Sequence, residues 1–183
     1  KAILSFSLPL VPYSVLLWGN NFLDRYLLLH LLGIGQVSVY AVAYSLGENV
    51  VIYPGTVIGE GCRIADNAVL GKQPVLSPRS TTPRDALPPL ELGPGTVVLT
   101  GAIVFAGTRI GARVIVADQA CVRERCTIGD DVVIGRGVLV ENDTVIGAMT
   151  KIQANAYITA YSTLEEEVFV APCVVTTNDN FMG

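Results

Sequence analysis

Aliphatic residues recur at every sixth position over most of the chain. The pattern is unbroken at fourteen successive positions: Leu92, Val98, Val104, Ile110, Val116, Val122, Ile128, Ile134, Val140, Ile146, Ile152, Ile158, Leu164 and Val170. The residue four places after each of them is small or β-branched. A six-residue period fits neither an amphipathic helix nor the two-residue alternation of a half-buried strand. It predicts a parallel β-helix, in which each hexad forms one short face and three hexads close one coil.

The same period begins at Leu46 and stops at Pro74. The segment 74–91 holds five prolines, which have no backbone N–H to donate to a sheet. We expect this segment to form an excursion loop that leaves the β-helix and returns in register at Leu92. The hexads on both sides of the loop then supply about six coils. In each hexad the aliphatic residue should point inward, and its fourth neighbour should lie beside a corner where only a modest side chain fits.

The first 45 residues differ in composition from the rest. Lys1, Asp24 and Arg25 are their only charged residues, so we predict a domain boundary near Ser45. The segment is too long for a signal peptide. It fits a broken or tilted membrane helix of about twenty residues, with a second helix beginning near Gly35. A hydrophobic amphipathic anchor is the alternative interpretation.

Two short elements support a resemblance for this segment. Asn21, Asp24 and Arg25 form an N-x-x-D-R element, and a second element follows at Val39, Tyr40, Ala43, Tyr44 and Ser45. Both resemble elements of the multidrug/oligosaccharide-lipid/polysaccharide flippases, where the second opens a membrane helix. Only a fragment of such a protein is matched, so the resemblance implies membrane contact for residues 1–45 and no transport function. An artificial or misassembled fusion is the other interpretation.

The β-helical part resembles another family. The stretch IQANAYITAYSTLEEEVFVAPCVVTTNDN is similar to the core of the sugar-nucleotide N-acetyltransferases, and GKQPVLSPRSTTPRD to a loop of uncharacterised members of that group. Residues 46–183 as a whole resemble the hexapeptide-repeat acyltransferases, so an all-β fold with a single-stranded left-handed parallel β-helix is implied.

The resemblance also implies an activity. Members transfer an acetyl group from acetyl-CoA to an amino or hydroxyl group of a nucleotide-linked sugar, in surface-polysaccharide biosynthesis. They are homotrimers that bind both substrates between neighbouring subunits, and a cytoplasmic location is implied for 46–183. In these enzymes further coils follow the equivalent of Val175 and contact the coenzyme. We therefore expect little transferase activity from residues 1–183 alone.

The chemistry must proceed without the usual base. Acyl transfer requires the acceptor to lose a proton, and histidine most often accepts it. The only histidine is His30, in the hydrophobic segment. Residues 46–183 contain no histidine. This also argues against a histidine-bound metal as in the carbonic-anhydrase branch of this fold, and we expect no metal. Two interpretations stay open: a carboxylate or the substrate's own amine serves as base, or further coils supply the catalytic group.

Two residues are candidates for catalysis. Asn155 matches a family position near the reacting groups, although an asparagine at a coil corner can also serve a left-handed backbone. Gln153 lies beside it and is a candidate for substrate binding. Glu141 stands where glycine or alanine is usual, and it opens the polar cluster 141–143. Its carboxylate can act as base or hold an amine; a solvated corner is the structural alternative.

Four further residues are candidates for substrate binding. Asn178 and Asp179 begin a second departure from the repeat, where family members contact the sugar nucleotide. Arg79 and Arg84 lie on the excursion loop, and guanidinium groups favour bidentate contacts with a diphosphate. Their alternative is an ordinary charged loop surface.

The cysteines and the net charge give little further indication of function. Cys62, Cys121, Cys126 and Cys173 form no Cys-x-x-Cys pair, so we interpret all four as small buried apolar residues of a protein in a reducing compartment. A net charge of −4 without a basic stripe argues against nucleic-acid binding. A catalytically silent trimerisation or ligand-binding scaffold remains the alternative to an enzyme. The irregular proline-rich loop favours the enzyme.

Overall fold

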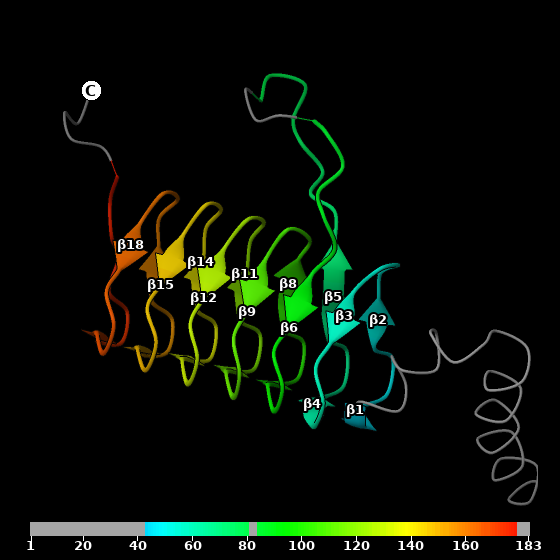
Figure 1. The fold of residues 1–183 in the computed structure, drawn as a ribbon. Helices are drawn as coiled ribbons and strands as arrows, with labels where there is room; N and C mark the ends of the chain where they lie inside the picture. Colours follow the sequence, from blue (N-terminus) through cyan, green and yellow to red (C-terminus); the bar gives the residue numbers. More distant parts are fainter. Residues whose placement is uncertain (1–42, 81–83, 179–183) are drawn as a thin grey trace, which may run out of the picture. The chain divides into compact units, whose positions relative to one another are not determined.

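The computed structural model describes residues 43–80 and 84–178, and these form a parallel β-helix (Figure 1). Its strands are mostly two residues long, and the described ranges contain no helix. Successive strands belong in turn to three sheets, which we call walls A, B and C. Every strand pairs in parallel with strands one coil away. The predicted parallel β-helix of about six coils is therefore confirmed.

Wall A consists of β1 (Ala43–Leu46), β4 (Cys62–Ile64), β7 (Val97–Val98), β10 (Ile115–Val116), β13 (Val133–Ile134), β16 (Lys151–Ile152) and β19 (Phe169–Val170). Wall B consists of β2 (Val51–Ile52), β5 (Val69–Lys72), β8 (Ile103–Phe105), β11 (Cys121–Val122), β14 (Leu139–Val140) and β17 (Tyr157–Ile158). Wall C consists of β3 (Val57–Ile58), β6 (Glu91–Leu92), β9 (Arg109–Ile110), β12 (Thr127–Ile128), β15 (Val145–Ile146) and β18 (Thr163–Leu164). We name the connecting turns by the walls they join: the A–B, B–C and C–A corners.

The six-residue period places its aliphatic residues in the core, as predicted. Ile110, Ile128 and Ile146 stack along wall C and are at most 4 % exposed. Their neighbours on the same strands point outward because successive side chains of a strand alternate between its two faces. Of the fourteen aliphatic residues, Leu164 alone is half-buried and not fully buried.

The position four residues after each aliphatic residue lies beside a corner and is buried in most coils. Threonine is tolerated there because its hydroxyl finds an acceptor in the next corner. The Thr96 hydroxyl donates to the carbonyl of Gly111 at 2.9 Å, and the Thr150 hydroxyl donates to that of Glu165 at 2.9 Å. A buried hydroxyl without such a partner would be destabilising.

The excursion loop leaves wall B after β5 and returns to wall C at β6, so it replaces one B–C corner (Figure 1). The core resumes at Leu90, which is fully buried, slightly earlier than the predicted return at Leu92. Gln73 closes the neck of the loop: its side-chain amide donates to the carbonyl of Leu87 and accepts from the Leu87 N–H, both at 3.1 Å.

The predicted N-terminal segment lies largely outside the described residues, including both proposed membrane helices and the Asn21–Arg25 element. Its last residues are described, and they correct the prediction. Ala43–Leu46 form strand β1, which pairs in parallel with β4, so they belong to the β-helix and do not open a membrane helix. Pairing with β4 satisfies the backbone groups along one edge of this segment. Among the described residues no helix has the length and apolar character needed to cross a bilayer.

Many corners use a left-handed backbone at a residue other than glycine. Within the described ranges twelve such residues occur, and Met149 on a C–A corner is one of them, with φ of 58° and an exposed side chain. We expect Met149→Gly to stabilise the fold by about 0.5–1 kcal/mol, because relief of left-handed strain exceeds the entropic cost of glycine. Urea unfolding of the variant tests this. Its control is Ala148→Gly, where the same entropic cost should destabilise the fold; an equal loss in both variants would contradict the prediction.

Candidate functional site

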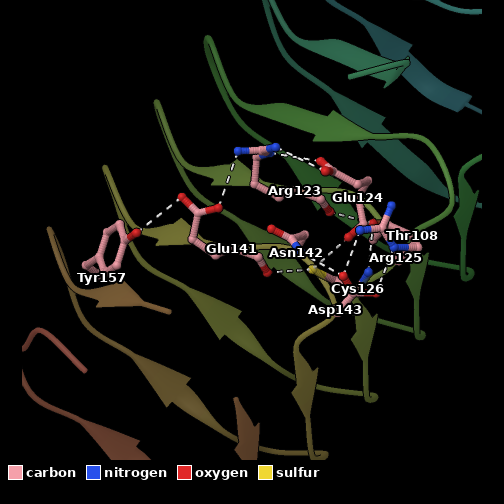
Figure 2. A network of polar contacts seen from close by, with 9 residues as sticks. All are labelled: Thr108, Arg123, Glu124, Arg125, Cys126, Glu141, Asn142, Asp143 and Tyr157. Atoms are coloured by element: carbon pink, nitrogen blue, oxygen red, sulfur yellow. Dashed lines mark hydrogen bonds and ion pairs between the residues drawn. The ribbon is translucent and has the colours of Figure 1, made fainter. Parts of the chain in front are cut away.

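A network of charged side chains lies on the B–C corners of two successive coils (Figure 2). One corner follows β11 and carries Arg123, Glu124 and Arg125; the next follows β14 and carries Glu141 and Asp143. The parallel register of walls B and C stacks residues 18 positions apart, as the pairing of β11 with β14 shows. This stacking sets Arg123 above Glu141 and Arg125 above Asp143.

Arg123 is the centre of the network. Its Nε and Nη2 donate to the two carboxylate oxygens of Glu124 at 2.8 and 3.0 Å, and its Nη1 donates to Glu141 Oε2 at 3.3 Å. The guanidinium carbon also lies 5.4 Å from the ring centroid of Phe105, within cation–π range. The Glu124 side chain is only 1 % exposed. Its hydrogen bonds raise the pKa of Arg123, so the guanidinium stays charged.

Glu141 is held at both oxygens. Arg123 donates to one of them, and the Tyr157 hydroxyl on wall B donates to the other, Oε1, at 3.3 Å (Figure 2). The side chain is 18 % exposed, so it is reachable from solvent. Burial of the ring and the negative charge of Glu141 raise the pKa of Tyr157, which keeps the phenol protonated as a donor. A half-buried carboxylate with a neutral donor beside it can accept a proton from a bound nucleophile.

A second ion pair lies on the same corners. Arg125 donates from Nε and Nη2 to the two oxygens of Asp143, both at 2.7 Å, and Asn142 Nδ2 donates to the same carboxylate at 2.6 Å. Both members of this pair are 27 % exposed, and Arg125 and Asp143 both have left-handed backbones. This pair fastens two corners together and does not involve Glu141.

The Arg125–Asp143 pair predicts a pH dependence of stability. Hydrogen bonds from Arg125 hold the pKa of Asp143 below its usual range. The stabilisation is therefore present above the unfolded-state pKa of about 3.9 and is lost as the pH falls through the lower folded-state value. We expect the difference in unfolding free energy between the natural chain and Asp143→Asn to shrink below about pH 4. Urea unfolding from pH 7 to 3 measures it; a pH-independent difference would contradict the role of the ionised carboxylate.

The candidate residues Asn155 and Gln153 lie on a different corner from Glu141. Both belong to the A–B corner between β16 and β17. Asn155 has a left-handed backbone with φ of 59°, is exposed, and donates its backbone N–H to the carbonyl of Arg136 at 2.8 Å. Asn155 therefore has the left-handed corner backbone that the sequence offered as the alternative to a catalytic role. Tyr157 connects the two places, because it follows Asn155 by two residues and its hydroxyl reaches Glu141.

Of the four further candidate binding residues, the three that the structure describes make no contact with Glu141. Asn178 follows Ala160 by 18 residues, and its Nδ2 donates to the carbonyl of Ala160 on the B–C corner between β17 and β18 at 3.1 Å. Asp179 lies outside the described residues. Arg84 donates from Nη2 to the carbonyls of Ser77 and Pro78 at 3.2 and 3.0 Å, so it braces the excursion loop. Arg79 is exposed on that loop. The loop nevertheless replaces a B–C corner, on the same side of the β-helix as Glu141.

Sequence reasoning missed Arg123, Glu124 and Tyr157. One signal was available: opposite charges recur 18 residues apart, at Arg123 with Glu141 and at Arg125 with Asp143. In a three-hexad coil this spacing places side chains directly above one another. Such a pair breaks no rule within a single hexad, and it is visible only when neighbouring coils are compared.

The four cysteines are free, and two of them confirm the prediction that all are buried. Cys62 and Cys126 are buried, whereas Cys121 is half-buried and Cys173 is exposed, which corrects the prediction for these two residues. Cys173 occupies a left-handed A–B corner position that points away from the core. Burial raises the pKa of Cys126 to about 12, so its thiol is protonated at neutral pH and donates to the Glu141 carbonyl at 3.1 Å. Over 43–80 and 84–178 no cluster of three or more His, Cys, Asp or Glu residues has a metal-binding arrangement.

The repeats have known counterparts. Residues 44–72 and 107–142 match the model of the bacterial transferase hexapeptide (six repeats). The chain therefore carries hexapeptide repeats of the kind found in this transferase family. A comparison with the curated proteins gives no significant match.

Solved structures with the same fold include acyltransferases. The acetyltransferase domain of PglB from Neisseria gonorrhoeae, in complex with acetyl coenzyme A, is 20% identical, with 67% of this chain and 51% of that chain covered at a TM-score of 0.55. The UDP-N-acetylglucosamine acyltransferase of Francisella novicida is 18% identical, with 73% and 52% covered at a TM-score of 0.61. A hexapeptide transferase family protein from Anaplasma phagocytophilum is 22% identical, with 67% and 69% covered at 0.50. The chain spans about half the length of the first two, and at these identities the likeness establishes the fold.

Proposed function

We propose that this protein is an acyltransferase that moves an acetyl group from acetyl-CoA to an amino or hydroxyl group of a nucleotide-linked sugar. The observation that carries the proposal is the carboxylate of Glu141, held at both oxygens on a hexapeptide-repeat β-helix. The acyl donor is suggested by the acetyl coenzyme A bound to the PglB domain, and the acceptor by the name of the Francisella enzyme. Surface-polysaccharide biosynthesis is the pathway in which we expect such a product.

Glu141 serves as the base in this proposal. The acceptor nitrogen attacks the thioester carbonyl carbon, a C–N bond forms, and the C–S bond breaks. Glu141 takes the proton that the nitrogen loses, and the proton passes to the departing sulfur, so the coenzyme leaves as a thiol. Tyr157 donates to the carboxylate and fixes the oxygen that faces it. Asn155 and Gln153 stay candidates for substrate contacts, as do Asn178, Asp179, Arg79 and Arg84.

A homotrimer is part of the same proposal. Wall B presents an outward column without any charged residue: Val51, Val69, Ile103, Cys121, Leu139, Tyr157 and, through a parallel bridge with Tyr157, Val175. Walls A and C include charged residues at the same positions, such as Lys151 and Glu91. Wall B is flanked by the A–B corner of Asn155 and the B–C corner of Glu141. Packing of wall B against a neighbouring subunit is expected to bring these corners of different subunits together.

The test is a thiol-release assay with acetyl-CoA and a panel of UDP-linked amino and hydroxyl sugars, at high protein concentration. Acceptor-dependent release of coenzyme A, together with an acetylated sugar detected by mass spectrometry, supports the proposal. Light scattering on the same sample should report three copies of the chain. The assay is run on residues 1–183 and on a form extended by further C-terminal coils. A trimer of the extended form that releases no thiol with any acceptor would favour the catalytically silent scaffold.

A further inference from the structure

Arg123 makes more contacts than a surface ion pair needs. Glu124 takes two of its nitrogens, Glu141 a third, and the guanidinium lies over the Phe105 ring. The Thr108 hydroxyl donates to the Arg123 carbonyl at 2.7 Å, so the backbone is held as well. A guanidinium restrained in this way has little freedom to follow a mobile partner. Its partner Glu141 must instead adopt the position that Arg123 allows.

Glu124 explains why the arrangement is rigid. Its carboxylate is almost completely buried, and burying a charge is costly unless it is paired and hydrogen-bonded. Both of its oxygens are taken by the bidentate fork of Arg123, which is the strong geometry for such a pair. The Glu141 carboxylate is more accessible, with 18 % exposure, and accepts a hydrogen bond from the remaining guanidinium nitrogen of Arg123. Glu124 therefore anchors Arg123, and Arg123 reaches out to Glu141.

We infer that the Arg123–Glu124 pair, anchored by the buried Glu124 carboxylate, is a positioning device that sets the orientation of the Glu141 carboxylate against Tyr157. The inference rests on the proposed function in one respect, namely that Glu141 is the base of the transfer. Neither Arg123 nor Glu124 is assigned a contact with substrate. Their effect on the reaction passes through Glu141.

The test compares two neutralised ion pairs. Arg123→Gln/Glu124→Gln removes the anchor and leaves no unpaired buried charge. Arg125→Gln/Asp143→Asn is the matched control, a bidentate pair on the same two corners that does not hold Glu141. With acetyl-CoA and the best acceptor, we expect the first variant to lose about 10- to 100-fold in kcat with the acceptor KM nearly unchanged. The control should stay within about two-fold of the natural chain, and circular dichroism should report the β-helix in both.

A second measurement is independent of activity. Urea unfolding of Tyr157→Phe, Glu141→Ala and the double variant gives the coupling between these two side chains, because alanine leaves no acceptor for the Tyr157 hydroxyl. We expect a measurable coupling in the natural chain and in the control background, and its loss when Arg123 and Glu124 are neutralised. If the coupling persists there, Arg123 does not position Glu141 and the inference is overturned.

The two proposals fail in different ways. If the natural chain transfers acetyl groups and Arg123→Gln/Glu124→Gln retains its kcat, the positioning role is wrong and the proposed function stands. If neither the natural chain nor its form extended by further C-terminal coils transfers any, the proposed function fails, and the coupling measurement decides whether the pair orients Glu141.

Discussion

Replacing Glu141 by glutamine is expected to lower kcat for acetyl transfer by about 10²- to 10⁴-fold, the range that a general base contributes. Glutamine is nearly isosteric and can still accept hydrogen bonds from Arg123 and Tyr157. It cannot accept the proton of the acceptor nitrogen. The acceptor KM should change little, because the side chain keeps its place beside wall B.

The control for this variant is Glu166→Gln. Glu166 lies on a C–A corner, is exposed, and has no assigned role. Its kcat should equal that of the natural chain. If Glu141→Gln keeps full activity, Glu141 is not the base. That result would support the other interpretation, in which the substrate's own amine needs no base from the protein.

The fold follows from the sequence because a β-helix repeats one local rule. Each hexad needs an aliphatic residue to fill the interior and a small or β-branched residue beside the corner. Both positions can be recognised within a single hexad. The buried Ile128 and Cys126 illustrate the pair. The rule fails where the chain leaves the coil, so the return at Leu90 and the start of β1 at Ala43 fell slightly outside the predicted bounds.

The site was less predictable, because it depends on contacts between coils. Glu141 stood out as a charge where a small residue is usual, and the structure places it in the network. Asn155 stood out for its match to a family motif, yet its left-handed corner has an equally complete structural explanation. Glu124 gave no signal alone: a carboxylate at a corner is ordinarily solvated, and only the fork of Arg123 accounts for its burial.

The two ion pairs of the B–C corners have different physical roles despite similar geometry. Arg125 and Asp143 are both 27 % exposed, so water screens their attraction and their loss costs little. Arg123 joins a buried carboxylate to an accessible one. This difference in burial predicts a large difference in the consequence of removing each arginine.

Arg123→Met alone is expected to destabilise the fold by about 3–5 kcal/mol, since it leaves the Glu124 carboxylate buried without a partner. Arg123→Gln/Glu124→Gln should cost much less, because no buried charge remains. Arg125→Met should cost about 1 kcal/mol or less, as for exposed pairs. Urea unfolding of the three variants at pH 7 measures the order. Equal losses in Arg123→Met and Arg125→Met would mean that Glu124 does not depend on the guanidinium, and the anchoring role of the pair would have to be abandoned.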